Sequence, residues 1–195
     1  MAASYNDILG WIGNISDINE CQGYWLLSST GEVLVTVGNK QPCDEYNIHY
    51  GANLVSYTCS NPLSIIDIEN ILIENDIHTI IGEGVAVTYN PMLGFFGSLE
   101  YLQPGRGYWM ISDSDDVSLS LDCPDETIDL SSRELLAPIN EYIQSTQQAF
   151  YFFADIEGVE IGDIIRAYYG DALIGARAWN GTYTDVPAMG LDMQN

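Results

Sequence analysis

A gapless internal duplication constrains this chain more than any other feature of its sequence. Residues 11–37 align with residues 95–121 at a constant offset of 84, and both copies carry a Gly-Tyr-Trp triplet. Repeated units of this kind are typical of proteins that stack or string copies of one module. The sequence therefore predicts a piece of repetitive modular architecture rather than a self-contained enzyme. The identical pairs are Gly13/Gly97, Gly23/Gly107, Tyr24/Tyr108, Trp25/Trp109, Ser28/Ser112 and Val33/Val117.

The duplicated segment has the pattern of a β-hairpin. In the second copy a glycine-containing turn at 104–107 precedes an aromatic strand at 108–111, an acidic turn at 113–116 and a strictly alternating segment at 117–121. The first copy repeats the pattern over 24–37, with its turn at 30–32. Nothing upstream of the first copy matches 51–90, which predicts that the chain begins partway through a repeat unit.

The remaining segments predict further β structure and one or two short helices. We expect a strand at 52–58, β structure with a glycine bend at 77–89, and a short helix over 64–73 with Ser64 as its N-cap. Further strands are predicted at 149–153, 163–169, 172–179 and 183–187, with Asn180-Gly181 as a hairpin signal. The predicted fold class is mainly β, with antiparallel sheets or a sandwich.

Four regions follow from these patterns. We expect a partial repeat copy at 1–40, a full repeat module at 41–121, a linker or connecting segment at 122–148 and a separate β module at 149–195. The acidic, proline-containing composition of 122–132 suits a linker.

Charge argues against nucleic-acid binding, and the distribution of apolar residues argues against membrane insertion. The 28 acidic and five basic residues give a formal net charge of −23. Nucleic-acid binding requires a cationic face that these few basic residues do not supply, and the absence of a long apolar run argues against membrane insertion. An acidic chain with Lys40 as its single lysine suits a salty or extracellular setting, although residues 1–7 lack the pattern of a signal peptide.

The four cysteines show no metal-binding spacing. Cys43 and Cys59 flank an extended segment and form the pair that the sequence favours, closing a loop of about 16 residues. Four buried free thiols are the alternative. The absence of a CxxC pair excludes a zinc ribbon and a thioredoxin-type site.

Two sets of motifs resemble modules of a known class of protein. The first combines Gly51-Ala52-Asn53-Leu54-Val55-Ser56 with 102–109, in the pattern L-x-P-G-x-G-Y-W. The second combines 162–168 with the Trp179-Asn180-Gly181 turn and the segment 186–190. Both resemble repeat modules of large secreted surface proteins of marine and gliding bacteria. The resemblance implies a structural role at the cell surface and no known chemistry.

Two kinds of ligand site follow from residue type. The first is an aromatic platform on which sugar rings stack, formed by the tyrosines and tryptophans of the two triplets together with Trp179. The alternative is that these aromatic side chains pack in the core. A calcium site is the other, because closely spaced carboxylates offer the hard oxygen ligands that calcium takes. Solvated acidic turns are the alternative there. The candidate aromatic residues are Tyr24, Trp25, Tyr108, Trp109 and Trp179, and the candidate metal ligands are Asp113, Asp115, Asp116, Asp163 and Asp171.

No motif for catalysis is present in the sequence. His49 and His78 have no partner at a triad or metal-ligand spacing, and no nucleotide-binding or metalloprotease pattern occurs. We therefore expect a non-catalytic binding or structural module of an extracellular surface or matrix protein, in which adhesion depends on glycans or calcium. Its expected partners are glycans or neighbouring copies of the chain. A virion or filament component and an unrecognised carboxylate-based hydrolase remain alternatives.

Overall fold

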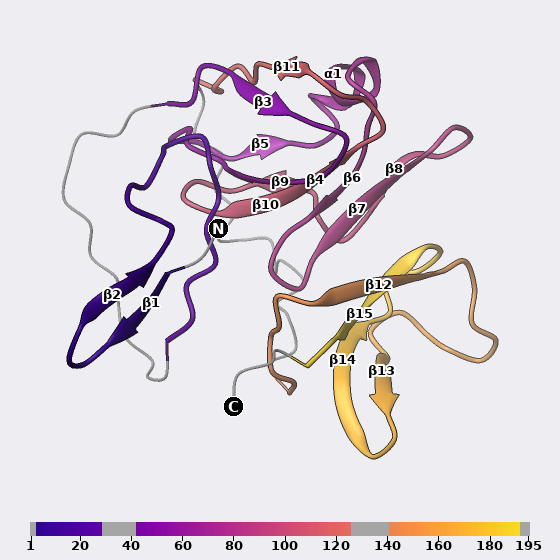
Figure 1. The fold of residues 1–195 in the computed structure, drawn as a ribbon. Coiled ribbons are helices and arrows are strands. Elements are labelled where there is room, and N and C mark those ends of the chain that lie inside the picture. The colour runs from indigo at the N-terminus through magenta and orange to yellow at the C-terminus, as the bar shows by residue number, and fades with distance from the viewer. Residues whose placement is uncertain (1–2, 29–41, 126–140, 192–195) are drawn as a thin grey trace.

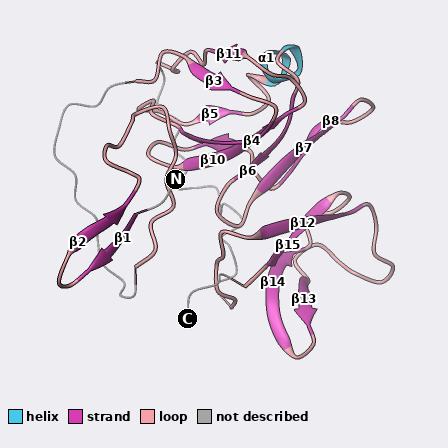
Figure 2. Ribbon diagram, in the orientation of Figure 1, coloured by secondary structure: helices cyan, strands magenta, loops and turns pink. Residues whose placement is uncertain are grey.

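The computed structural model describes residues 3–28, 42–125 and 141–191. Within these ranges the chain is built from antiparallel strand pairs and a single short helix (Figure 2). The mainly β fold class predicted from the sequence is confirmed. This described part of the chain contains no helix with the length and apolarity that a membrane span requires.

A five-stranded antiparallel sheet forms the centre of the first module. Strands β4 and β10 alternate between a buried face and a more exposed face, so β10 buries Tyr108, Met110 and Ser112 while Trp109 and Ile111 lie on the other side. The order of its strands is β4 (Gly51–Ser56), β10 (Gly107–Ser112), β6 (Ile77–Ile81), β7 (Ala86–Asn90) and β8 (Gly94–Gly97).

The buried face of this sheet packs against smaller elements that lie above it in Figure 1. Together they enclose one hydrophobic core between Cys43 and Leu121, in which Leu72, Leu102 and Leu119 are fully buried. The covering elements are the pair β3 (Tyr46–Ile48) and β11 (Val117–Leu119), the pair β5 (Leu63–Ser64) and β9 (Tyr101–Leu102), and helix α1 (Glu69–Glu74).

The β-hairpin predicted for the second copy is wrong in its pairing. Both of its strands form, but β10 pairs with β4 and β6, whereas β11 pairs with β3. The acidic turn redirects the chain: Asp113 donates its backbone N–H to Asp76, and Asp116 adopts a positive φ of 57°. The corresponding hairpin predicted for 24–37 lies largely outside the described residues.

The predicted helix exists but begins five residues later than Ser64. Ser64 instead pairs with Tyr101 in the β5–β9 ladder, and the adjacent Ile65 donates its N–H to the carbonyl of Glu100. The helix starts at Glu69 after Ile68, which provides no side-chain cap. Strand pairing next to buried apolar side chains therefore outweighs the local capping preference of serine.

The last four strands form a C-terminal module. They are β12 (Gln148–Phe153), β13 (Ile164–Tyr169), β14 (Ala172–Ala178) and β15 (Thr184–Met189), close to the predicted ranges. The hairpin expected at Asn180-Gly181 is wrong, because β14 pairs with β13 while β15 pairs with β12. Tyr183 donates its backbone N–H to Phe153 and so directs β15 onto β12. The predicted linker at 122–148 falls mainly outside the described residues.

A buried ion pair joins the C-terminal module to the β7–β8 hairpin. The side chains of Arg177 and Asp185 are each 2% exposed and lie 2.9 Å apart. Arg177 also donates to the carbonyl of Gly84 and to the hydroxyl of Ser98, and that hydroxyl donates to Asp185. Beside this network, Phe96 of β8 contacts the rings of Phe152 and Tyr183. The two modules thus share a junction that is polar at its centre and aromatic at its edge.

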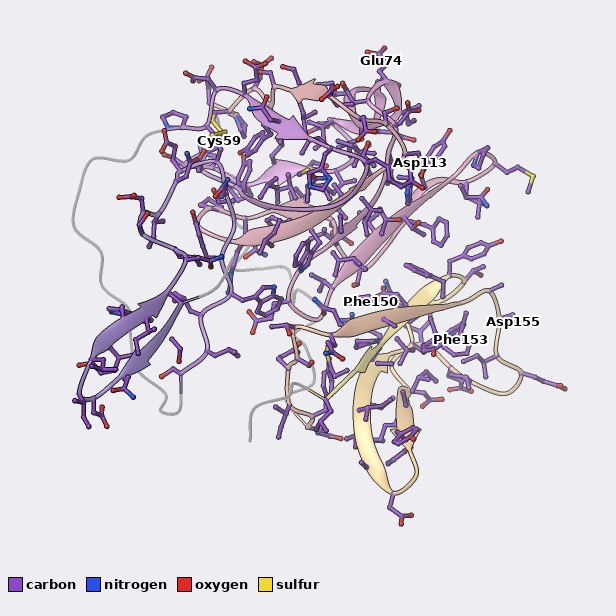
Figure 3. The ribbon with its side chains drawn as sticks, viewed as in Figure 1. Cys59, Glu74, Asp113, Phe150, Phe153 and Asp155 are labelled. Atoms are coloured by element: carbon purple, nitrogen blue, oxygen red, sulfur yellow. A yellow bond between two sulfur atoms is a disulfide. The ribbon has the colours of Figure 1, made fainter. Side chains whose placement is uncertain are left out.

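Both disulfide expectations from the sequence are wrong. Cys21 is bonded to Cys43, and Cys59 is bonded to Cys123. Cys43 and Cys59 are both buried and lie on neighbouring segments, where the N–H of Cys43 donates to the hydroxyl of Thr58. Their sulfur atoms nevertheless bond to other cysteines and not to each other. The first bond ties the N-terminal copy to the core, and the second bond, beside the labelled Cys59 in Figure 3, closes the main module.

The expectation that nothing upstream of the first copy matches 51–90 is wrong, because residues 3–6 repeat residues 87–90. Strands β1 (Ala3–Asn6) and β2 (Gly10–Gly13) form a hairpin with the register of β7 and β8, each residue pair displaced by 84. The glycines agree in backbone conformation, with φ of 71° at Gly10 and 75° at Gly94. In each turn an asparagine side chain, Asn6 or Asn90, accepts the N–H two residues ahead at 2.9 Å.

Removing each disulfide should lower stability in the order of the loop lengths. The Cys59–Cys123 bond spans 64 residues and the Cys21–Cys43 bond spans 22, so double alanine variants should lose about 4 and about 3 kcal/mol of unfolding free energy, respectively. Urea denaturation followed by tryptophan fluorescence measures both. A larger loss from the Cys21/Cys43 variant would contradict the loop-entropy order.

Breaking the buried Arg177–Asp185 pair should be far more costly than breaking a surface pair. Arg177→Met leaves the buried Asp185 without its cation and should cost about 3–5 kcal/mol. The matched control is Arg106→Met, whose ion pair with Glu83 is exposed and should contribute about 0–1 kcal/mol. Equal losses in the two variants, measured by denaturant unfolding, would show that the junction does not depend on this pair.

Candidate functional site

A groove of about 680 Å³ lies where the two copies of the repeat meet. It brings together four of the five aromatic residues predicted from the sequence: Tyr24 and Trp25 from the first copy, and Tyr108 and Trp109 from the second. Its volume falls in the range of small-molecule sites, about 300–1,000 Å³.

The two tryptophans supply the apolar surface of the groove. Trp109 is half-buried on the sheet face opposite the core, between Leu54 of β4 and Ile81 of β6. Trp25 is also half-buried, and its indole Nε1 is shielded from solvent with no hydrogen-bond partner among the described residues.

The two tyrosines have a structural role that is the same in both copies. The hydroxyl of Tyr108 accepts the N–H of Gln103 at 2.8 Å, and the hydroxyl of Tyr24 accepts the N–H of Asn19 at 2.9 Å. Each tyrosine therefore closes the turn that begins five residues before it. Tyr108 is 3% exposed, and burial raises the pKa of its phenol. Tyr108 thus belongs to the core, as the alternative interpretation of the sequence held.

Close packing requires the glycine of the first triplet, whereas the space at the second is less restricted. A Cβ on Gly23 would lie 2.7 Å from the carbonyl oxygen of Val55, and a Cβ on Gly107 would lie 3.8 Å from the Cα of Gly23. Gly23 also donates its N–H to Leu54 at 3.0 Å. The first copy therefore approaches the sheet backbone where any larger residue would force a shift.

Polar side chains line the rim of the groove. Arg106 forms an ion pair with Glu83 at 3.2 Å, and both side chains are more than half exposed. Glu100, Tyr101 and Gln103 line the same groove. The groove therefore joins an aromatic floor to carboxylate, amide and guanidinium groups, which can hydrogen-bond the hydroxyl groups of a ligand.

A second groove of about 650 Å³ adjoins the first. Tyr24, Leu54 and Trp109 line both of them, so Trp109 lies between two hollows on one sheet face. The second groove is otherwise lined mainly by polar residues, among them Asp17, Asn47 and His49.

Trp179, the fifth predicted aromatic residue, lies elsewhere. It is 6% exposed in the C-terminal module, where its backbone N–H and carbonyl bond to Asp163 and Gly162. It is a core residue of that module and does not line either groove.

The predicted calcium ligands lie in three separate places, with Asp113, Asp115 and Asp116 in one turn and Asp163 and Asp171 in two others. Asp113 lies 3.5 Å from His78, and Asp115 accepts the N–H of Tyr50 at 2.8 Å. In the C-terminal module, Asp163 accepts the N–H of Glu160, and Asp171 lies exposed in the β13–β14 turn. Figure 3 shows Asp113 apart from Phe150, Phe153 and Asp155 of the C-terminal module. Among the described residues, no three His, Cys, Asp or Glu side chains converge as a metal site would require.

Several groove residues have no recognisable signal in the sequence. Glu83 lies in the β6–β7 turn and Arg106 in the turn before β10, 23 residues apart, and only the pairing of β10 with β6 brings them together. The duplicated triplet in the sequence predicts only the aromatic residues of the groove and not its charged ones.

Compared with protein-family models, curated proteins and solved structures, the chain matches none of them.

Replacing Tyr108 should destabilise the fold more than replacing its counterpart Tyr24. Tyr108→Phe leaves the N–H of Gln103 without its acceptor in a buried setting and should cost about 1–3 kcal/mol of unfolding free energy. Tyr24→Phe removes the same hydrogen bond at an exposed turn and should cost about 1 kcal/mol or less. Urea unfolding of both variants checks the order, and a larger loss for Tyr24→Phe would contradict it.

Proposed function

We propose that the chain is a non-catalytic binding module of an extracellular surface or matrix protein, and that the groove between Trp25 and Trp109 binds glycans. The observation that carries this proposal is the meeting of the two repeat copies at one groove, which joins two half-buried tryptophans to polar side chains. Sugar rings have apolar C–H faces and hydroxyl edges. They therefore suit a site with aromatic faces on its floor and hydrogen-bonding groups on its rim.

The charge of the chain narrows the class of glycan. A net charge of −23 repels anionic polysaccharides, and Glu83 and Glu100 line the groove itself. Among the described residues Arg106 is the one cation that lines the groove, and its charge is already paired with Glu83. We therefore propose neutral glycans as ligands. The two adjoining grooves on either side of Trp109 favour an oligosaccharide over a single sugar.

The extracellular part of the proposal rests on the cysteines. Two disulfides link all four cysteines, and disulfides persist in oxidising compartments outside the cytosol. The resemblance of the sequence motifs to secreted surface modules supports the same setting. Calcium dependence, the other adhesion mode expected from the sequence, has no converging carboxylates to support it among the described residues.

A binding assay with neutral polysaccharides tests the proposal. We expect retention of the chain in affinity electrophoresis through neutral β-glucans, mannans or galactans, followed by measurable heat in calorimetry with the matching oligosaccharide. Trp109→Ala should weaken binding at least tenfold, because each stacking aromatic contributes on the order of 1 kcal/mol or more to such a site. Glu83→Ala combined with Arg106→Ala tests the rim without altering the sheet.

The matched control is Trp11→Ala, which removes an equally large ring, 69% exposed, from the β1–β2 hairpin outside the groove. Its affinity should equal that of the unaltered chain. Melting temperatures of all variants separate lost binding from lost folding. Failure of the unaltered chain to bind any neutral glycan would overturn the proposal.

The hydrolase alternative is separable in the same samples. A carboxylate-based hydrolase would release reducing ends from the bound polysaccharide, and Glu83→Gln or Glu100→Gln would abolish that release. A binding module retains its ligand intact.

A further inference from the structure

The β1–β2 hairpin exposes an unusual amount of apolar surface. Tyr5, Ile8, Leu9, Trp11 and Ile12 are 62, 90, 72, 69 and 49% exposed. Figure 1 shows the hairpin standing apart from the five-stranded sheet, at the end of the segment that leads to Cys21. A two-stranded hairpin of this kind is marginally stable in water, and it gains stability when a third strand or a packed layer is added.

Its replica in the same chain shows where a third strand belongs. β7 and β8 have the register of β1 and β2, and the outer edge of β7 pairs with β6 through Thr88, Val87 and Ala86. The equivalent edge is the outer edge of β1, which among the described residues pairs only with β2. The ring contact between Tyr5 and Trp11, at 5.6 Å, repeats the contact between Tyr89 and Phe95 at 5.3 Å.

The elements that pack against β7 and β8 already have partners within the chain. β6 lies between β10 and β7, and Phe152 and Tyr183 already contact Phe96. A second copy of the chain therefore cannot offer these elements without unfolding its own junction. It can offer its own β1 edge.

The charge of the hairpin permits close approach of two copies. Asp7 is the one charged residue in the segment 3–13 of a chain that carries 28 acidic residues. Two such hairpins can meet while the remaining carboxylates stay apart, and added salt screens the repulsion between them. The exposed apolar side chains present on the order of 700 Å² per copy over both faces and the turn of the hairpin, and pairing through β1 buries the part of this surface that lies beside the new strand.

We propose that two copies of the chain associate through β1, forming a four-stranded antiparallel sheet from two β1–β2 hairpins with Tyr5 on the twofold axis. This register keeps Tyr5 and Trp11 of both copies on one face of the new sheet, because directly opposed residues of antiparallel strands share a face. Such an isologous pair closes as a dimer. The edge of β1 then has the third strand that β7 has in β6.

Sedimentation velocity over a concentration series tests the proposal. The unaltered chain should form a reversible dimer whose population rises with protein concentration and with sodium chloride. Tyr5→Lys places two ammonium groups on the axis and should weaken dimerisation at least tenfold. The matched control Tyr169→Lys, at a tyrosine 81% exposed on β13, should leave dimerisation unchanged.

A chemical test of the register keeps the proposal falsifiable if Tyr5→Lys unfolds the hairpin. Tyr5→Cys should form an intermolecular disulfide under mild oxidation faster than Tyr169→Cys, because the axis brings its two thiols together. A monomer at every concentration and salt level would overturn the proposal. So would a dimer that resists Tyr5→Lys, or equal rates of cross-linking for the two cysteine variants.

Discussion

The buried pair of Arg177 and Asp185 fixes the relation between the two modules. Both charges are removed from solvent, so each depends on the other, and Arg177 also donates to the hydroxyl of Ser98, which follows β8, and to the carbonyl of Gly84 in the β6–β7 turn. A buried pair adds geometric demands even where it adds little net stability, because neither charge tolerates the loss of its partner. The β7–β8 hairpin therefore serves as the common support of the C-terminal module, of β6 and, through the sheet, of the groove at Trp109.

The repeat carries two kinds of information that the structure separates. One kind maintains the backbone: the asparagine turns at Asn6 and Asn90, and the tyrosines whose hydroxyls accept an N–H five residues before them. The other kind creates the groove, because Trp25 and Trp109 lie on the half-buried side of the sheet, facing away from the core. The Gly-Tyr-Trp triplet of the first copy thus combines close packing, turn closure and groove lining in three consecutive residues.

Sequence patterns predicted the strands better than their partners. Period-two alternation identifies β10 and β11, and β-rich segments identify β12 to β15, because alternation reflects one buried face. Strand pairing depends on the whole fold: β11 pairs with β3, and β15 pairs with β12, and in both cases the two partners are far apart in the chain. The disulfides failed as predictions for the same reason, since the partners of Cys21 and Cys123 are also set by the tertiary fold. The aromatic half of the groove followed from the duplicated triplet, whereas Glu83 and Arg106 meet through strand order alone.

The disulfides also define a covalent route through the molecule. Between residues 21 and 123 the shortest bonded path crosses from Cys21 to Cys43, follows the chain to Cys59 and crosses again to Cys123. It passes through β3 and β4 and omits α1, β6, β7, β8 and β10. Tension applied between the N-terminal hairpin and the C-terminal module is therefore carried past most of the central sheet by sulfur–sulfur bonds. The groove at Trp109 sits on strands of which only β4 lies on this path, so pulling on the chain leaves most of its floor mechanically shielded.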